Sequence, residues 1–114
     1  MTDILTELTA LLSSILPVET AIFSGKTPPE YAVLTPLIDT DTLFGDNCPG
    51  VEVQEVRISI YTKHNYISLK NGITKMLYNN DFVITEKRYI EREDDTGYFH
   101  YCIDAAKQYI LEEE

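Results

Sequence analysis

A chain of 114 residues is long enough to form one domain, residues 1–114, with a core that needs no disulfides to hold it. Its composition is strongly acidic, with 19 Asp and Glu against nine Lys and Arg and a formal net charge of −10. This charge disfavours binding to nucleic acid through its phosphates, and no apolar run approaches the length that crosses a bilayer. The N-terminus lacks the pattern of a signal peptide, so we expect a cytoplasmic chain in which Cys48 and Cys102 are free thiols.

The first element expected is a helix that begins after Thr2 or Asp3 and continues to Pro17, which disfavours helical geometry at the residue before it. Its apolar residues recur at the spacing of one helical face. Two strands are predicted next, at residues 18–23 and 31–35, because both segments are rich in β-branched and aromatic residues. The apolar face of the helix consists of Ile4, Leu8, Leu11, Leu12 and Ile15.

Residues 39–50 are predicted to form a long connection or a protruding hairpin that carries Asp39, Asp41 and Asp46. The spacing of these carboxylates raises the possibility of a calcium site. However, the glycine and the distal glutamate of a helix–loop–helix calcium site are not at the positions that such a site requires. An ordinary solvated loop explains the same composition, and we expect no metal.

The centre of the chain is predicted to be a strand followed at once by a helix. Residues 56–61 alternate apolar and polar side chains, which indicates a strand with one buried face. Asn65 is a suitable N-cap, and from Tyr66 the apolar period becomes helical until residues 79–81. Val51 and Val53 have the opposite phase of alternation from residues 56–60, which predicts a β-bulge at Gln54–Glu55.

Two further strands are predicted at residues 82–89 and 98–105, joined by a charged turn at 91–97. Beyond Ala106 the pattern fits either a continued strand or a short helix, and residues 112–114 form a charged tail. The expected fold is therefore α+β, an antiparallel (mixed) sheet of about five strands with two helices packed on one face. The expected order of elements is α-β-β-β-α-β-β.

Residues that could carry chemistry are few. His100, Cys102 and Asp104 alternate along one strand and so project from the same face, where they could bind a metal or activate a thiolate. They supply too few soft ligands for a structural zinc site, and alternating polar residues on an exposed sheet face explain them without chemistry. His64 begins the second helix, where capping or solvent exposure is the simpler role. We expect no catalytic residues, no cofactor and no enzymatic activity.

Tyrosine is abundant, with eight residues in the chain. Tyr61, Tyr89 and Tyr98 are expected on the sheet face away from the helices, where tyrosine suits a surface that is buried on assembly. We therefore predict that these three, together with Phe44, belong to a subunit or partner interface. Cross-strand packing within one chain is the alternative.

Several segments together resemble a known family. They are residues 23–33 (FSGKTPPEYAV), 46–47 (DN), 56–63 (VRISIYTK), 86–89 and 98–101 (YFHY). They resemble the tail-terminator, or head-to-tail joining (tail completion), proteins of long-tailed bacteriophages and prophages, over nearly the whole chain. This chain departs from the pattern at Glu30, between Pro29 and Tyr31, and at residues 48–50 (CPG).

The resemblance implies a structural virion protein that forms a ring, typically a hexamer, at the head-proximal end of the tail. Its partners would be itself, the tail-tube protein and the head connector or stopper protein. DNA would pass through the ring only as cargo, with the acidic loop of Asp39, Asp41 and Asp46 toward the channel or a partner. The protein would reside in the virion tail, and in the host cytoplasm during assembly. A head-completion stopper or adaptor remains an alternative, as does a small dimeric ligand-binding regulatory domain.

Overall fold

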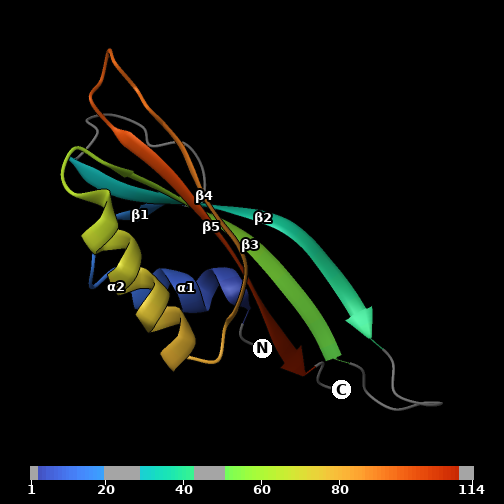
Figure 1. The fold of residues 1–114 in the computed structure, drawn as a ribbon. Helices are drawn as coiled ribbons and strands as arrows, with labels where there is room; N and C mark the ends of the chain where they lie inside the picture. The colour runs from blue at the N-terminus through green and yellow to red at the C-terminus, as the bar shows by residue number, and fades with distance from the viewer. Residues whose placement is uncertain (1–2, 20–28, 43–50, 111–114) are drawn as a thin grey trace.

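The structure is a computed structural model, and it describes residues 3–19, 29–42 and 51–110. A twisted sheet runs the length of the molecule, and two helices lie on one of its faces (Figure 1). They are α1, Ile4–Leu12, and α2, Tyr66–Asn79. We call the opposite face of the sheet the outer face.

Helix α1 is shorter than predicted. Asp3 caps it, with its side-chain Oδ1 accepting a hydrogen bond from the N–H of Thr6 at 2.8 Å. The helix ends at Leu12 and does not reach Pro17, and the Ser13 hydroxyl donates to the carbonyl of Thr9 in its last turn. Ile15, expected on the apolar face, is 38% exposed.

Strands of very unequal length form the sheet. In the described part of the chain the spatial order is β1-β2-β3-β5-β4, and every neighbouring pair is antiparallel except β1 and β2. The bounds are β1 Val18–Glu19, β2 Glu30–Thr42, β3 Val51–Thr62, β4 Val83–Arg92 and β5 Phe99–Ile110.

The expected fold is wrong in its strands. For the described residues, four long antiparallel strands form the sheet and follow the order α-β-β-α-β-β with the helices. Of the segment expected as the first strand, 18–23, the described residues Val18 and Glu19 form β1, a two-residue parallel pairing with Ala32 and Val33 of β2. Residues 20–23 lie outside the described residues. Composition alone does not give the number of strands, because strand propensity depends strongly on context.

The predicted bulge at Gln54–Glu55 is wrong as well. β3 stays in register with β5 along its whole length, from Val51 opposite Ile110 to Thr62 opposite Phe99. The register shift lies instead in β2, between Pro36 and Ile38, directly opposite the predicted position. β2 thus continues through Pro36, whose missing N–H is tolerated at a bulge.

The central strand–helix unit is confirmed. β3 ends at Thr62, and Asn65 Oδ1 accepts a hydrogen bond from the N–H of Ile67 at 2.9 Å, capping α2. After α2 the chain reverses at Asp81, whose φ of 67° is a left-handed conformation that Asp tolerates. Beyond Ala106 the chain continues as strand β5, which settles the alternative left open by its sequence.

The core lies between the helices and the sheet. Leu8 and Leu12 from α1 and Ile73 and Leu77 from α2 are each 0% exposed. They pack on the inward residues of the two central strands, and each such side chain contributes about 1.5–3 kcal/mol when fully buried. The inward strand residues are Val56, Ile58, Ile60, Ile103 and Ala105.

Candidate functional site

Four rings meet on the outer face at the end of the sheet that carries the β4–β5 hairpin. The Tyr31 and Tyr61 rings stack with centroids 4.8 Å apart, and His100 stacks on the other side of Tyr61 at 4.3 Å. Tyr98 meets Tyr31 edge-on at 5.5 Å. Because Tyr31, Tyr61 and His100 come from three adjacent strands, their rings align across the sheet. We call these four residues the tyrosine cluster.

Burial changes the acid–base properties of this cluster. Desolvation, followed by the neighbouring phenols of Tyr61 and Tyr98, raises the pKa of Tyr31 to about 12. Desolvation also lowers the pKa of His100, and the carboxylates of Glu91 and Glu93 only partly oppose that effect. Both shifts favour the neutral forms of the Tyr31 and His100 rings at neutral pH.

The three polar residues predicted to share a strand face do share it, but they have different partners. The side chain of Asp104 accepts two hydrogen bonds from Arg57, at 2.9 and 3.1 Å. Cys102 Sγ lies 3.6 Å from His100 Nε2 and 3.7 Å from the hydroxyl of Ser59, and the cysteine is 6% exposed. Among the described residues no group of three or more His, Cys, Asp and Glu is arranged to hold a metal ion.

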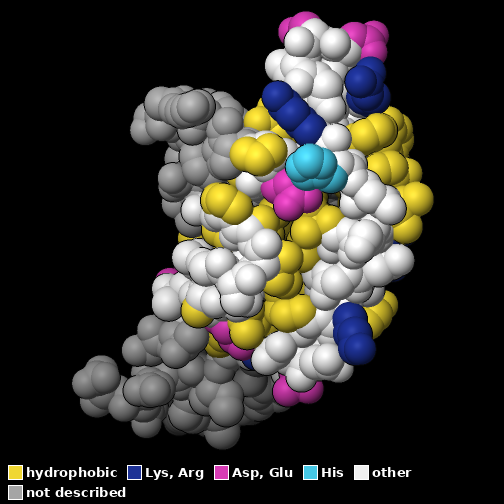
Figure 2. Space-filling model, turned by 90° about the vertical axis from the view of Figure 1, so that its left-hand side faces the viewer, with side chains coloured by type: hydrophobic (Ala, Val, Ile, Leu, Met, Phe, Trp, Pro, Cys, Tyr) yellow, Lys and Arg dark blue, Asp and Glu magenta, His cyan; other side chains and the backbone are white. Residues whose placement is uncertain are grey.

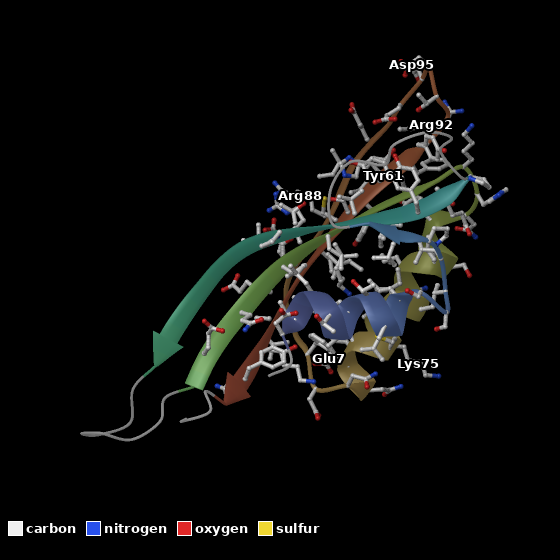
Figure 3. The ribbon with its side chains drawn as sticks, turned by 180° about the vertical axis from the view of Figure 1, so that it is seen from behind. Glu7, Tyr61, Lys75, Arg88, Arg92 and Asp95 are labelled. Atoms are coloured by element: carbon white, nitrogen blue, oxygen red, sulfur yellow. The ribbon has the colours of Figure 1, made fainter. Side chains whose placement is uncertain are left out.

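The predicted interface tyrosines separate onto two faces. Tyr61 lies on the outer face, and Tyr98 is only 6% exposed beside it (Figure 3). Tyr89 is on the helix-bearing face instead, where its ring lies 5.3 Å from that of Tyr66 in α2. A bulge in β4 between Ile84 and Glu86 reverses the alternation that was used to place it. Tyr89 is 44% exposed, so it remains available to a partner.

The predicted acidic loop is partly a strand. Asp39 and Asp41 belong to β2, where they pair in register with Gln54 and Glu52 of β3. Phe44 and Asp46 lie outside the described residues. Strands β2, β3 and β5 extend past the helices here and form what we call the arm (Figure 1). Lys107 is the single cation among the residues that make up the arm, 38–42, 51–55 and 107–110.

Sequence reasoning did not identify the residues that fix the arm to α1. Lys107 Nζ donates to Glu7 Oε2 at 2.6 Å and to the carbonyl of Asn80 at 3.0 Å. The hydroxyl of Tyr109 donates to the other carboxylate oxygen of Glu7 at 2.8 Å. Burial of the ring, followed by this hydrogen bond to Glu7, raises the pKa of Tyr109. Glu7 lies about 100 positions from Lys107 and Tyr109 in the sequence, so no local pattern could have paired them.

A groove with a volume of about 650 Å³ lies where β4 begins, at Val83, beside the arm. We call it the β5 groove, because β5 forms its floor. Sequence analysis gave no indication of it, since it depends on β5 being longer than β4. Its lining residues are Val53, Glu55, Asp81, Val83, Thr85, Ala106, Lys107 and Gln108.

The side of the molecule on which α2 begins carries both charged and hydrophobic side chains. Figure 2 shows charged side chains gathered at the end of the β4–β5 hairpin and hydrophobic side chains along the middle of this face. Exposed hydrophobic residues lie on α2 and β4, namely Ile67, Tyr78, Val83, Tyr89 and Ile90.

In the described part of the chain, neither helix is long and apolar enough to span a membrane. No protein-family model matches the sequence, and no curated protein matches it. Among solved structures, the chain is similar to a chain of the virion of a native gene transfer agent (GTA) particle. The TM-score is 0.54 at 15% sequence identity, covering 92% of this chain and 84% of that chain. The two chains share a fold.

Proposed function

We propose that this protein is a structural, non-enzymatic component of a phage-like virion. In that role it forms a ring, a hexamer in the first instance, which terminates the tail tube and joins it to the head connector. The observation that carries the proposal is the shared fold with a chain of a GTA virion, which extends over nearly the whole of both chains. The family resemblance of the sequence independently favours the head–tail junction.

The two edges of the sheet differ from each other, which favours assembly into a ring. β4 lies at one edge, and the segment of β2 beyond its short pairing with β1 lies at the other, so one copy offers two different surfaces. A contact between unlike surfaces repeats head to tail and closes into a ring when the rotation fits. β2 carries Glu30, Asp39 and Asp41 and no cation, whereas β4 carries Lys87, Arg88 and Arg92 together with Glu86 and Glu91. The β2 edge is therefore acidic, and the β4 edge has only a small excess of positive charge.

Tyr89 is the residue we place in the subunit contact. It is 44% exposed on edge strand β4, next to Ile90 at 39%, and tyrosine is enriched in protein interfaces. Tyr61 and Tyr98 contribute through the tyrosine cluster, which keeps the neighbouring surface rigid. The acidic residues of β2 in turn suit a DNA conduit, because they repel the phosphates of DNA that passes as cargo.

The test is the mass of the purified protein by light scattering across a range of concentrations, with negative-stain images of any large species. A hexamer with a central hole, or a monomer–hexamer equilibrium, supports the proposal. Tyr89→Ser should shift that equilibrium toward monomer, whereas Tyr78→Ser, on the exposed side of α2, should not. A dimer at every concentration would reject the ring and favour a ligand-binding domain that uses the β5 groove.

Position in the virion needs a second experiment, because a stopper or adaptor of the connector also forms a ring. Purified tail-tube protein and connector protein are each mixed with this protein and sedimented. Co-sedimentation with tubes, together with tubes of fixed length, supports a terminator. Binding to the connector alone would replace the terminator with a stopper. Asp39→Asn with Asp41→Asn should slow DNA passage if the acidic residues line the channel.

A further inference from the structure

Strand β5 is longer than the strand beside it. The last residue pair between β4 and β5 joins Val83 to Ala106, yet β5 continues to Ile110. Along Lys107–Ile110, β5 pairs with β3 on one side, and no described strand pairs with it on the other. Backbone groups at such an edge can hydrogen-bond to another strand that lies beside them.

The β5 groove meets this edge at Lys107 and Gln108 and extends over Val53 and Glu55 of the neighbouring strand β3. Val53, Val83 and Ala106 supply its apolar surface, and Val83 is 62% exposed although it is a large aliphatic residue. Because β4 begins only at Val83, no described strand covers the apolar surface of β3 and β5 beyond that residue. A strand added beside residues 107–110 would cover Val83 and continue the line of β4.

The charge of the groove is negative. Glu55 and Asp81 line it, and neither makes an ion pair with another described residue. Among the described residues that line it, the one cation is Lys107, which is held by Glu7 and by the carbonyl of Asn80. A basic segment therefore gains attraction from two carboxylates without displacing an existing partner.

We propose that the β5 groove binds an extended, basic segment of a partner protein as an additional strand of the sheet. Backbone hydrogen bonds to residues 107–110 supply affinity, as in other cases of strand addition. Alternate side chains supply specificity, with small apolar residues against Val53 and Val83 and Lys or Arg against Glu55 and Asp81. This inference goes beyond the proposed function and does not depend on ring formation.

Two other occupants fit less well. The C-terminal residues of this chain, Glu112–Glu114, are all acidic and would be repelled by Glu55 and Asp81. A second copy could offer its β4 edge, which contains Lys87 and Arg88. However, Glu86 and Glu91 accompany those cations on the same strand, so its charge complementarity is weaker.

The probe is a synthetic peptide of about seven residues that alternates valine with lysine, because side chains of a strand alternate between faces. Binding is measured by calorimetry at low salt, and hydrogen exchange is followed at residues 107–110. We expect binding that slows exchange at those of these amides that point away from β3, and that weakens with added salt. The controls are a valine–glutamate peptide and a basic peptide N-methylated along one edge, and neither should bind.

The matched variants separate the groove from the general acidity of the protein. Glu55→Gln combined with Asp81→Asn should weaken the valine–lysine peptide about tenfold, whereas Asp94→Asn with Asp95→Asn, at the far hairpin, should leave its affinity unchanged. Asparagine is chosen at position 81 because it also tolerates the left-handed backbone there.

Three results of the peptide experiment would overturn the proposal. They are no binding of the basic peptide, equal binding of the N-methylated peptide, and binding without protection at residues 107–110. Protection of the same amides by increasing protein concentration alone would assign the groove to a second copy and also reject the proposal. Peptide binding is measured in whatever oligomeric state the protein adopts. Ring formation is tested separately, by the mass of the protein from light scattering.

Discussion

Gln54 and Ile4, 50 positions apart, are joined by a buried hydrogen bond of 2.8 Å from the backbone N–H of Ile4 to the side-chain Oε1 of Gln54. Ile4 is the first residue of α1, so its N–H has no acceptor within the helix. Gln54 is 6% exposed and supplies that acceptor from β3. The bond therefore fixes the start of α1 on the sheet.

Replacement of Gln54 by leucine should lower the free energy of unfolding by about 1–3 kcal/mol, because it leaves a buried N–H without an acceptor while keeping the apolar volume. The measurement is urea denaturation. Gln108→Leu, at an exposed glutamine on β5, is the control and should change stability by less than about 0.5 kcal/mol. Equal effects of the two substitutions would show that the bond to Ile4 does not stabilise the fold.

The ion pair between Arg57 and Asp104 should contribute about 1 kcal/mol of coupling energy in a double-mutant cycle of Arg57→Met and Asp104→Asn. Its two hydrogen bonds and the 9% exposure of the Asp104 side chain favour a measurable value. The Arg57 side chain is 35% exposed, so solvent screening reduces the coupling below that of a buried pair. A coupling energy of zero would indicate that the pair is only a surface contact.

Alkaline solution should destabilise the protein through Tyr31. Its pKa is about 12 in the folded state against an ordinary value near 10, so both states are protonated below about pH 10. Between about pH 10 and 12 the unfolded chain loses the proton and the folded chain keeps it, so stability falls as pH rises. Tyr31→Phe should reduce this slope in urea titrations. Burial also raises the pKa of Tyr61 and Tyr101, so part of the slope should remain.

Mildly acidic solution should act through His100, whose pKa is lowered by desolvation in the folded state. Above its ordinary value near 6.5, the imidazole is neutral in both states and stability is at its full value. As pH falls, the unfolded chain binds the proton first, so the free energy of unfolding decreases down to the folded pKa. His100→Gln should flatten the dependence between about pH 7 and 5. NMR titration of the His100 ring gives the folded pKa directly, and a value above 6.5 would contradict this prediction.

Local periodicity was sufficient for the central part of the fold. The alternation over 56–61, the cap at Asn65 and the helical period from Tyr66 together predicted the end of β3 and the start of α2, because caps and amphipathic faces depend on neighbours within a few residues. The acidic balance was likewise fixed by composition alone.

Tertiary pairing decided which way the other side chains point. Gln54 points inward, within reach of α1, because β3 keeps one phase of alternation and the bulge expected there lies across the ladder in β2. Tyr89 lies beside Tyr66 because a bulge after Ile84 moves the residues that follow it to the opposite face, until a second bulge after Tyr89 restores the alternation. One extra residue in a strand reverses its alternation, and whether that residue is present depends on the partner strand. The β5 groove follows from the same cause, since only the paired structure shows that β4 stops short of β5.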